Sequence, residues 1–114
     1  MRLLVCGGRS FDNQKAINKA LRTIHEETPI ALLIHGGASG ADQLAGMWAN
    51  NHGLPVARMD APWKVLGRKA GPVRNGWMLA LLLPDAVLAF AGGAGTQNMK
   101  AQAQAAGVRI IDAS

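Results

Sequence analysis

The sequence predicts an α/β domain of three layers, in which a five-stranded parallel sheet with the order 3-2-1-4-5 lies between two layers of helices. Two observations lead to this prediction. Short apolar runs alternate along the chain with longer segments whose apolar residues recur at helical spacing. Three of the apolar runs also end directly in a glycine-rich turn that precedes a helix-like segment. This alternation is typical of strand–helix–strand units with parallel strands.

The five apolar runs have the length and composition of buried strands. The first, second and fourth are almost wholly apolar, as expected for strands that are covered on both faces of a parallel sheet. The third begins with Pro55 and contains Arg58, and both residues suit an edge strand. The predicted strands are residues 3–6, 30–34, 55–59, 86–90 and 108–111.

Four segments between these runs are predicted helices. Asp12 is a suitable N-cap for the first helix, and Ile17 and Leu21 lie on its apolar face. Pro72 fits the first turn of the third helix, and Thr96 is a candidate N-cap for the fourth. The predicted helices are residues 12–27, 40–51, 72–83 and 96–106.

The segment 61–71 has no clear periodicity and predicts a long loop. Connections of this length without secondary structure are uncommon in small domains and are often functional. Arg68 and Lys69 in this segment could close over an anionic ligand. We therefore interpret it as a candidate flap.

The predicted strand order brings the three glycine turns together. Right-handed crossovers leave few topologies, and the order 3-2-1-4-5 makes strands one, two and four the central three. These are the strands that end in glycine turns. In such sheets a ligand lies beyond the carboxyl ends of the strands, where the strand order reverses. The sequence therefore predicts one binding site at that edge.

Composition excludes several classes of protein. The 114 residues suit one domain, and the hydrophobic fraction of 49% is enough for a core. No apolar stretch approaches the roughly 20 residues that span a bilayer, and the chain begins without a signal-peptide pattern. A single cysteine, Cys6, cannot form an internal disulfide. We therefore expect a cytoplasmic protein with no membrane partner.

The net charge of +5 favours anionic partners. One basic cluster contains Lys64, Arg68, Lys69 and Arg74, and the other basic residues are spread along the chain. Aromatic residues make up only 4% of the chain, so few side chains could stack on single-stranded bases. A small anionic ligand is thus favoured over nucleic acid.

The glycine turns are candidates to bind a phosphate through their backbone. Glycine lets a ligand approach the main chain closely, and free N–H groups at a helix N-terminus favour an anion. Tight turns also use glycine for purely structural reasons. The predicted ligand-binding residues in these turns are Gly7, Gly8, Gly36, Gly37, Gly40, Gly92, Gly93, Ala94, Gly95 and Thr96.

Five side chains next to these turns are candidates to bind the rest of a ligand. Arg9 and Ser10 could reach a phosphate or a sugar hydroxyl, although Ser10 could instead cap the next helix. Ser39 and Asp42 open the second helix, where Asp42 either caps it or accepts a hydrogen bond from a ribose or a base. Arg74, which we place in the first turn of its helix, is the best candidate for a phosphate or carboxylate clamp.

The sequence contains no complete motif for a known catalytic centre. The P-loop pattern and the G-x-S-x-G elbow are absent, and one cysteine with three separated histidines gives no zinc pattern. No metal or required cofactor is therefore expected. His35 ends a buried strand and is interpreted as a structural group. Gln97 and Asn98 follow the third turn, and neither amide can act as a general base.

Four motifs in this order resemble the SLOG superfamily, and within it the YspA/YpsA-related branch. They are residues 7–11 (GGRSF), 35–42 (HGGASGAD), 70–75 (AGPVRN) and 92–96 (GGAGT). The superfamily includes the LOG phosphoribohydrolases and the DNA-processing protein A, which binds single-stranded DNA. The resemblance implies a Rossmann-like fold, a nucleotide-type ligand such as AMP, ADP-ribose or an NAD derivative, and a role as a sensor or effector in nucleotide signalling.

The chain departs from the LOG enzymes at the residues that serve hydrolysis. Those enzymes carry two glutamates after the Gly-Gly-x-Gly-Thr turn, where this chain has Asn98 and Met99. They also have lysine after the arginine that matches Arg74, where this chain has Asn75. The resemblance therefore implies that phosphate binding is retained, whereas hydrolysis by the LOG route is doubtful.

Three functions stay open at this point. The leading hypothesis is nucleotide binding at the glycine turns. A second is nucleotide N-glycosidic hydrolysis, with Asp42 as the only well-placed carboxylate, and a third is a module that binds single-stranded nucleic acid. The wholly apolar run 77–83 and the dimers of LOG-type relatives also predict a homodimer or a higher homo-oligomer.

Overall fold

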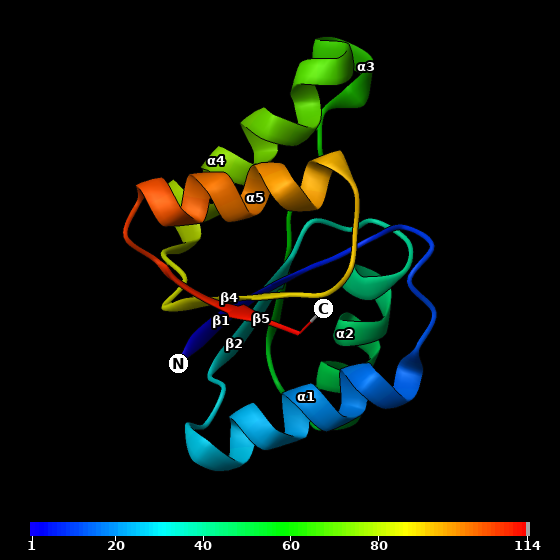
Figure 1. The fold of residues 1–114 in the computed structure, drawn as a ribbon, viewed down its shortest axis with the longest axis vertical. Coiled ribbons are helices and arrows are strands. Elements are labelled where there is room, and N and C mark those ends of the chain that lie inside the picture. Colours follow the sequence, from blue (N-terminus) through cyan, green and yellow to red (C-terminus); the bar gives the residue numbers. More distant parts are fainter. Residues whose placement is uncertain (114) are drawn as a thin grey trace.

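A computed structural model describes residues 1–113 and shows a five-stranded sheet in which every pair of neighbouring strands is parallel. The strand order is β3-β2-β1-β4-β5, so the predicted fold class and order are confirmed (Figure 1). β1 lies at the centre and pairs with β2 on one side and with β4 on the other. The strands are β1 Arg2–Cys6, β2 Leu32–His35, β3 Val56–Arg58, β4 Ala86–Ala89 and β5 Arg109–Asp112.

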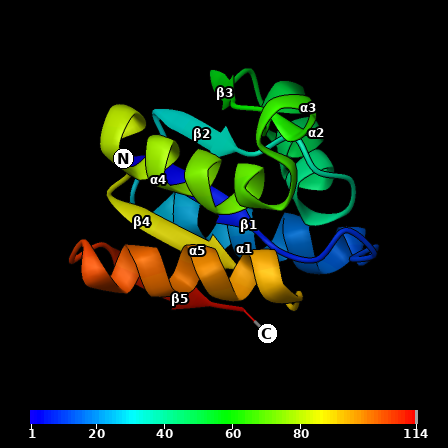
Figure 2. The ribbon, with the colours of Figure 1, turned by 90° about the horizontal axis from the view of Figure 1, so that it is seen from above.

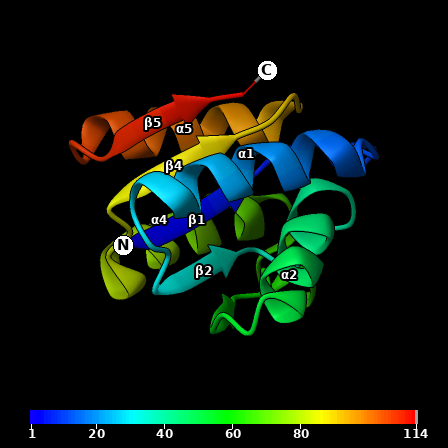
Figure 3. The same cartoon turned by 90° about the horizontal axis from the view of Figure 1, so that it is seen from below.

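Helices cover both faces of this sheet. α4 and α5 lie side by side on one face (Figure 2), and α1 and α2 cover the other (Figure 3). Each connection between neighbouring parallel strands crosses over through at least one helix, as parallel pairing requires. The helices are α1 Gln14–Glu27, α2 Ala41–Asn51, α3 Trp63–Leu66, α4 Ala70–Leu82 and α5 Ala94–Ala105, and a 3₁₀ turn, η1 Gly67–Lys69, joins α3 to α4.

The alternation of side chains along β1 divides the core into two layers. Leu3 and Val5 pack in the layer beneath α1 and α2, which also contains Ile17 and Leu21 from the predicted apolar face of α1. Leu4 and Cys6 point the other way, into the layer beneath α4 and α5. Burial on both faces explains why the central strands are continuous apolar runs.

Three predicted helix starts are wrong by one to three residues. The N-cap of α1 is Asn13, whose Oδ1 accepts a hydrogen bond from the Ala16 N–H, rather than Asp12. α5 begins at Ala94 with Gly93 as its N-cap, so Thr96 is a buried residue inside the first turn. α4 begins at Ala70, which places Arg74 in its second turn. Helix ends depend on local capping geometry, which apolar periodicity does not resolve.

The predicted loop 61–71 is also wrong, because most of it is helical. α3 and η1 form two short turns that lead directly into α4. Gly67, with a positive φ of 57° that favours glycine, caps the end of α3 and begins η1. Turns this short bury no continuous stripe, and α3 buries none of its residues, so no periodic pattern marks them in the sequence.

The apolar end of α4 is only partly buried. Met78 lies in the core, whereas Trp77, Leu81 and Leu83 are 41%, 66% and 63% exposed. Such side chains leave an apolar face without a partner in the part of the chain that the structure describes. Self-association through this face stays a prediction. Within residues 1–113, every helix is too short or too polar to cross a bilayer.

Candidate functional site

A cavity of about 1230 Å³ lies at the carboxyl edge of the sheet, where the strand order reverses between β1 and β4. Figure 2 shows these two strands side by side. All three glycine turns contribute to the cavity, together with α3 and α4. Most of the predicted site residues line this cavity: Gly7, Gly8, Arg9, Gly36, Gly37, Ser39, Asp42, Arg74, Gly93, Ala94, Gly95 and Thr96. Ser10, Gly40 and Gly92 were predicted as well and are not among its lining residues.

The β1–α1 turn uses its backbone to hold the neighbouring loops. The Gly8 N–H donates to the Ala91 carbonyl at 2.8 Å, and the Gly8 carbonyl accepts from the N–H of Phe11 and of Ala41. A Cβ on Gly7 would lie 2.6 Å from the Cβ of Ala41. Glycine at position 7 therefore permits the close contact between β1 and α2. The role of this turn is to pack the neighbouring loops together.

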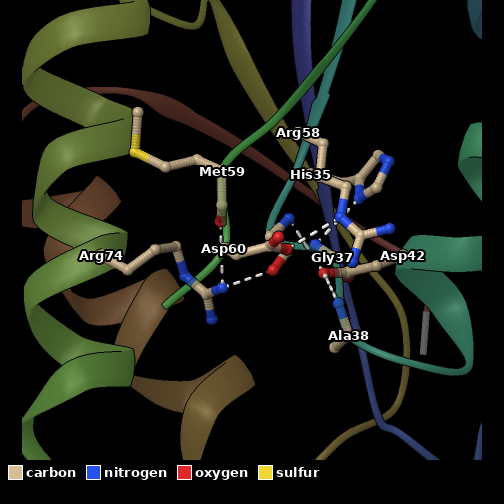
Figure 4. A network of polar contacts seen from close by, with 9 residues as sticks. His35, Gly37, Ala38, Asp42, Arg58, Met59, Asp60 and Arg74 are labelled. Carbon is tan, nitrogen blue, oxygen red and sulfur yellow. Dashed lines mark hydrogen bonds and ion pairs between the residues drawn. The ribbon is translucent and has the colours of Figure 1, made fainter. Parts of the chain in front are cut away.

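The β2–α2 turn is also closed on itself (Figure 4). Asp42 Oδ2 accepts hydrogen bonds from the N–H groups of Gly36, at 3.0 Å, and Ala38, at 3.3 Å. The Gly37 N–H donates to Nδ1 of His35 at 3.0 Å, which is the structural role expected for that histidine. The N–H groups of the three residues in this turn are therefore occupied by side chains of the protein itself.

One side chain and one glycine join the β2–α2 turn to the β1–α1 turn. The Ser39 hydroxyl donates to the Arg9 carbonyl at 3.2 Å. Gly40 has a φ of 78°, and a Cβ there would collide with the carbonyl oxygens of Gly8 and Arg9. Glycine at position 40 thus serves the contact between the two loops, which explains why it lies outside the cavity lining.

Burial changes the acidity of three groups at this edge. It raises the pKa of Asp42 to about 6, although the hydrogen bonds from Ala38 and Gly36 and the charge of Arg74 act in the opposite direction. Burial lowers the pKa of His35, so the neutral imidazole that accepts from Gly37 is favoured. Burial also raises the pKa of the Cys6 thiol to about 12, which makes it a poor nucleophile.

The β4–α5 turn differs because its backbone donors are open. Ala94, Gly95 and Thr96 form the first turn of α5, and their N–H groups have no partner within residues 1–113. A Cβ on Gly93 or on Gly95 would meet no atom within 4 Å. A helix N-terminus of this kind offers several donors and a positive dipole end to an anion in the cavity.

Arg74 reaches the cavity from α4 and is held by three acceptors (Figure 4). Its Nη1 donates to the carbonyls of Gly36, at 2.6 Å, and Met59, at 3.3 Å, and its Nε donates to Asn75 Oδ1 at 3.1 Å. A Cβ on Gly36 would lie 2.5 Å from Nη1, so a larger residue there would displace the guanidinium from these acceptors. Nη2 has no partner among the described residues, which leaves one edge of the fixed guanidinium free for a ligand.

A chain of amides replaces the acids expected of a hydrolase at this position. Asn98 Oδ1 accepts hydrogen bonds from Asn75 Nδ2, at 3.2 Å, and from Gln102 Nε2, at 2.7 Å. Gln102 also donates to the Pro72 carbonyl. Met99 is buried in the core beneath α4 and α5. These residues tie α5 to α4 and contribute no group that exchanges a proton.

The cavity carries an excess of positive charge. Four arginines and two aspartates line it, and Asp60 pairs with Arg58 at 2.8 Å. Burial is the main reason that the pKa of Arg74 is lowered, and the nearby charge of Arg9 acts in the same direction. Two cations thus face the same space, which favours an anion there. The lining arginines are Arg9, Arg58, Arg68 and Arg74.

Several lining residues were not among the predicted site residues. Arg58 ends β3 and Asp60 follows it, and their position at the carboxyl end of a parallel strand could have indicated them. Trp63 and Asn75 lie on α3 and α4, and no sequence pattern places them in the cavity. The predicted flap residue Arg68 lines the cavity, whereas Lys69 does not.

Comparisons with known proteins identify the family of this chain. A family model described as the YspA, cpYpsA-related SLOG family matches residues 1–65. The Gene 61 protein of Mycobacterium phage D29 is 34% identical over 119 aligned residues, which cover 97% of this chain and 94% of the phage protein. No solved structure gives a significant match. The chain therefore belongs to the YspA/cpYpsA-related SLOG family.

Proposed function

We propose that this protein binds a nucleotide or another ribose-phosphate compound in the cavity at the carboxyl edge of the sheet. The phosphate lies on the open N–H groups of Ala94, Gly95 and Thr96, and the free edge of Arg74 completes its coordination. One observation carries the proposal. A Cβ at position 95 would meet no neighbouring atom, and Gly95 lies in the first turn of α5 without a positive φ, so neither packing nor backbone conformation requires glycine there.

The remaining physical reason for glycine at position 95 is close approach of a ligand to the main chain, whereas Gly93 is also the N-cap of α5. Gly95 even lies inside a helix, where glycine costs about 0.5–1 kcal/mol relative to alanine. A phosphate at this point would gain charge-assisted hydrogen bonds from N–H groups that already point away from the helix. The arginines of the cavity lining would supply the balancing charge.

The residues around the turn support binding more than hydrolysis. Asn98 and Asn75 hold one another and stabilise the packing of α5 on α4, and neither amide gives or takes a proton. Membership of the SLOG family is consistent with a nucleotide-related ligand. A domain that binds such a ligand without cleaving it would act as a sensor or an effector.

Titration calorimetry tests this function directly. AMP, ADP-ribose and NAD are titrated into the wild-type protein, and adenosine serves as the ligand that lacks phosphate. We expect binding of at least one phosphate-bearing compound and a loss of about 10- to 100-fold in Arg74→Ala, the usual effect of a lost hydrogen bond to a charged group. Affinity for adenosine should not change.

Arg22→Ala is the matched control, because Arg22 is exposed on α1 and does not line the cavity. It should bind like the wild type. No binding of any phosphate compound by the wild type, or equal affinities in wild type and Arg74→Ala, would contradict the proposed function.

N-glycosidic hydrolysis is a second candidate, and one observation favours it. Asp42 lines the cavity, and burial raises its pKa to about 6, in the range useful for general acid–base catalysis. Nucleoside monophosphates incubated with the protein should then release free base, and Asp42→Asn should abolish the release while retaining an oxygen that accepts from the turn. Absence of free base with the wild-type protein would exclude this candidate.

A further inference from the structure

The geometry points to Trp63 as a stacking platform for the base of the bound nucleotide, an inference that rests on the proposed function. Trp63 lies at the start of α3, and its indole lines the same cavity as the β4–α5 turn. α3 stands at the carboxyl edge of the sheet, near the loops that follow β1 and β2 (Figure 2). A ligand with its phosphate on α5 could therefore reach this ring with its other end.

Trp63 is the aromatic side chain that the cavity presents to a ligand. Its exposed fraction is 47%, whereas Trp48 is 5% exposed and lies in the core. Phe11 and Phe90 pack on each other at a ring distance of 5.1 Å. Of the aromatic side chains in residues 1–113, Trp63 alone lines the cavity. A large apolar ring left half open in a polar, positively charged cavity suits an aromatic ligand group.

The ring of Trp63 is held in position from two sides. A Cβ on Gly71 would lie 3.1 Å from the Cη2 atom of the indole, so the edge of the ring lies directly against α4. The Arg9 guanidinium carbon lies 5.4 Å from the ring centroid. This side chain makes no hydrogen bond or ion pair with the rest of the described chain. The indole therefore rests against α4, whereas the Arg9 side chain over its face is free to move.

A base fits between these two groups after a small displacement of Arg9. Stacked planar groups lie about 3.5 Å apart, so a base between the indole and the guanidinium requires roughly 7 Å. Outward movement of Arg9 by about 2 Å provides that space and leaves the cation over the second face of the base. The resulting order is indole, base, guanidinium. A purine offers a larger stacking surface than a pyrimidine and is the class of base that we infer.

A comparison of AMP with ribose 5-phosphate tests this inference, because the two ligands share the phosphate and differ in the base. In Trp63→Ala the affinity for AMP should fall about tenfold, the usual effect of removing one aromatic partner of a stacked base. Affinity for ribose 5-phosphate should stay within about twofold. Trp63→Phe should lose less affinity for AMP than Trp63→Ala, since a phenyl ring still stacks on part of the base.

Two further variants separate stacking from a general effect on the protein. Trp77→Ala removes another exposed tryptophan outside the cavity and should leave both affinities unchanged. Gly71→Ala keeps the indole but displaces it. This variant should lower the affinity for AMP and leave the affinity for ribose 5-phosphate unchanged. Quenching of tryptophan fluorescence by AMP should be present in the wild type and lost in Trp63→Phe.

The possible outcomes separate this inference from the proposed function. Unchanged AMP affinity in Trp63→Ala, or equal losses for AMP and ribose 5-phosphate, would overturn the stacking role and leave phosphate binding intact. A change of oligomeric state in Trp63→Ala with normal AMP binding would overturn it as well. Failure of the wild type to bind either compound would overturn the proposed function, and with it this inference.

Discussion

The β2–α2 turn and the β4–α5 turn both follow a central strand and both contain two successive glycines, yet they use their backbones in opposite ways. In the first, Asp42 and His35 accept the N–H groups of residues 36–38. In the second, the N–H groups of residues 94–96 have no acceptor within residues 1–113. The first turn is complete without a ligand, whereas the second offers a set of donors to one.

The difference shows that a glycine-rich turn at a strand end is not by itself a binding site. What matters is whether the protein provides its own acceptor. A carboxylate six residues after Gly36 closes the β2–α2 turn, and the corresponding position after Gly92 is Asn98, which faces α4 instead. Six variants and pH titrations test this contrast, beginning with the largest expected effect.

Gly92→Ala should cause the largest loss of stability, about 3 kcal/mol, because the new Cβ would overpack a closely packed turn. It would lie 2.7 Å from the Gly8 nitrogen and would collide with Oγ1 of Thr96. Gly93→Ala, whose Cβ would meet no neighbouring atom, is the matched control and should lose only about 1 kcal/mol, because alanine is a poorer N-cap of α5 than glycine. Urea denaturation measures both, and similar losses for the two variants would show that the turn is packed differently.

Asp42→Ala should destabilise the protein by about 2 kcal/mol, because two N–H groups of the β2–α2 turn lose their acceptor. Asp42→Asn retains an accepting oxygen and should lose clearly less stability than Asp42→Ala. Denaturation near pH 3.5 is the suitable measurement, since the carboxyl is then largely protonated in both the folded and the unfolded chain and its ionisation contributes little. An alanine variant as stable as the asparagine variant would mean that Asp42 does not close the turn.

The stability of the wild type relative to Asp42→Asn should fall as the pH rises. Burial raises the pKa of Asp42 from 3.8 to about 6, so the folded protein holds this proton more tightly than the unfolded chain. The stabilisation is complete below about pH 4 and is lost through about pH 6, which gives about 1 kcal/mol between pH 5 and pH 7. Denaturation midpoints across this range provide the measurement.

His35 acts in the opposite direction, since burial lowers its pKa and stability from this group is lost as the pH falls. Both proteins contain His35, so subtracting the curve of Asp42→Asn removes its contribution. A difference between the two curves that is flat or rises with pH would contradict the burial of Asp42.

Gly95→Ala should have the smallest effect and the opposite sign. Alanine is a better helix former than glycine, and the position has free space, so stability should increase by about 0.5 kcal/mol. Gly40→Ala is the informative contrast, because its φ of 78° and its contact with the Gly8 carbonyl make alanine unfavourable there. Thermal denaturation distinguishes the two, and destabilisation by Gly95→Ala would indicate an unrecognised packing contact.

The sequence allowed most of the fold to be predicted because the signals were strong and local. Continuous apolar runs marked the buried strands, and helical periodicity around Ile17 and Leu21 marked a helix face. Strand order followed from the polarity of the edge strands and from the general handedness of crossovers. α3 and η1 were missed because a single turn of helix has no periodic stripe to recognise.

The location of the site was predictable, but the role of each turn in it was not. The glycine turns indicated the carboxyl edge of the sheet, where the cavity lies. Whether an N–H group is already bonded depends on a carboxylate such as Asp42 turning back onto its own loop, which is a matter of three-dimensional geometry. The same applies to Asn75 and Trp63, which reach the cavity only through the orientation of α3 and α4.

Backbone amide shifts during a titration with AMP test the central contrast most directly. In ¹⁵N-labelled protein we expect the largest changes at the amides of Ala94, Gly95 and Thr96, and only small changes at those of Gly36 and Gly37. Large shifts confined to the β2–α2 turn, with the β4–α5 amides unchanged, would contradict the account.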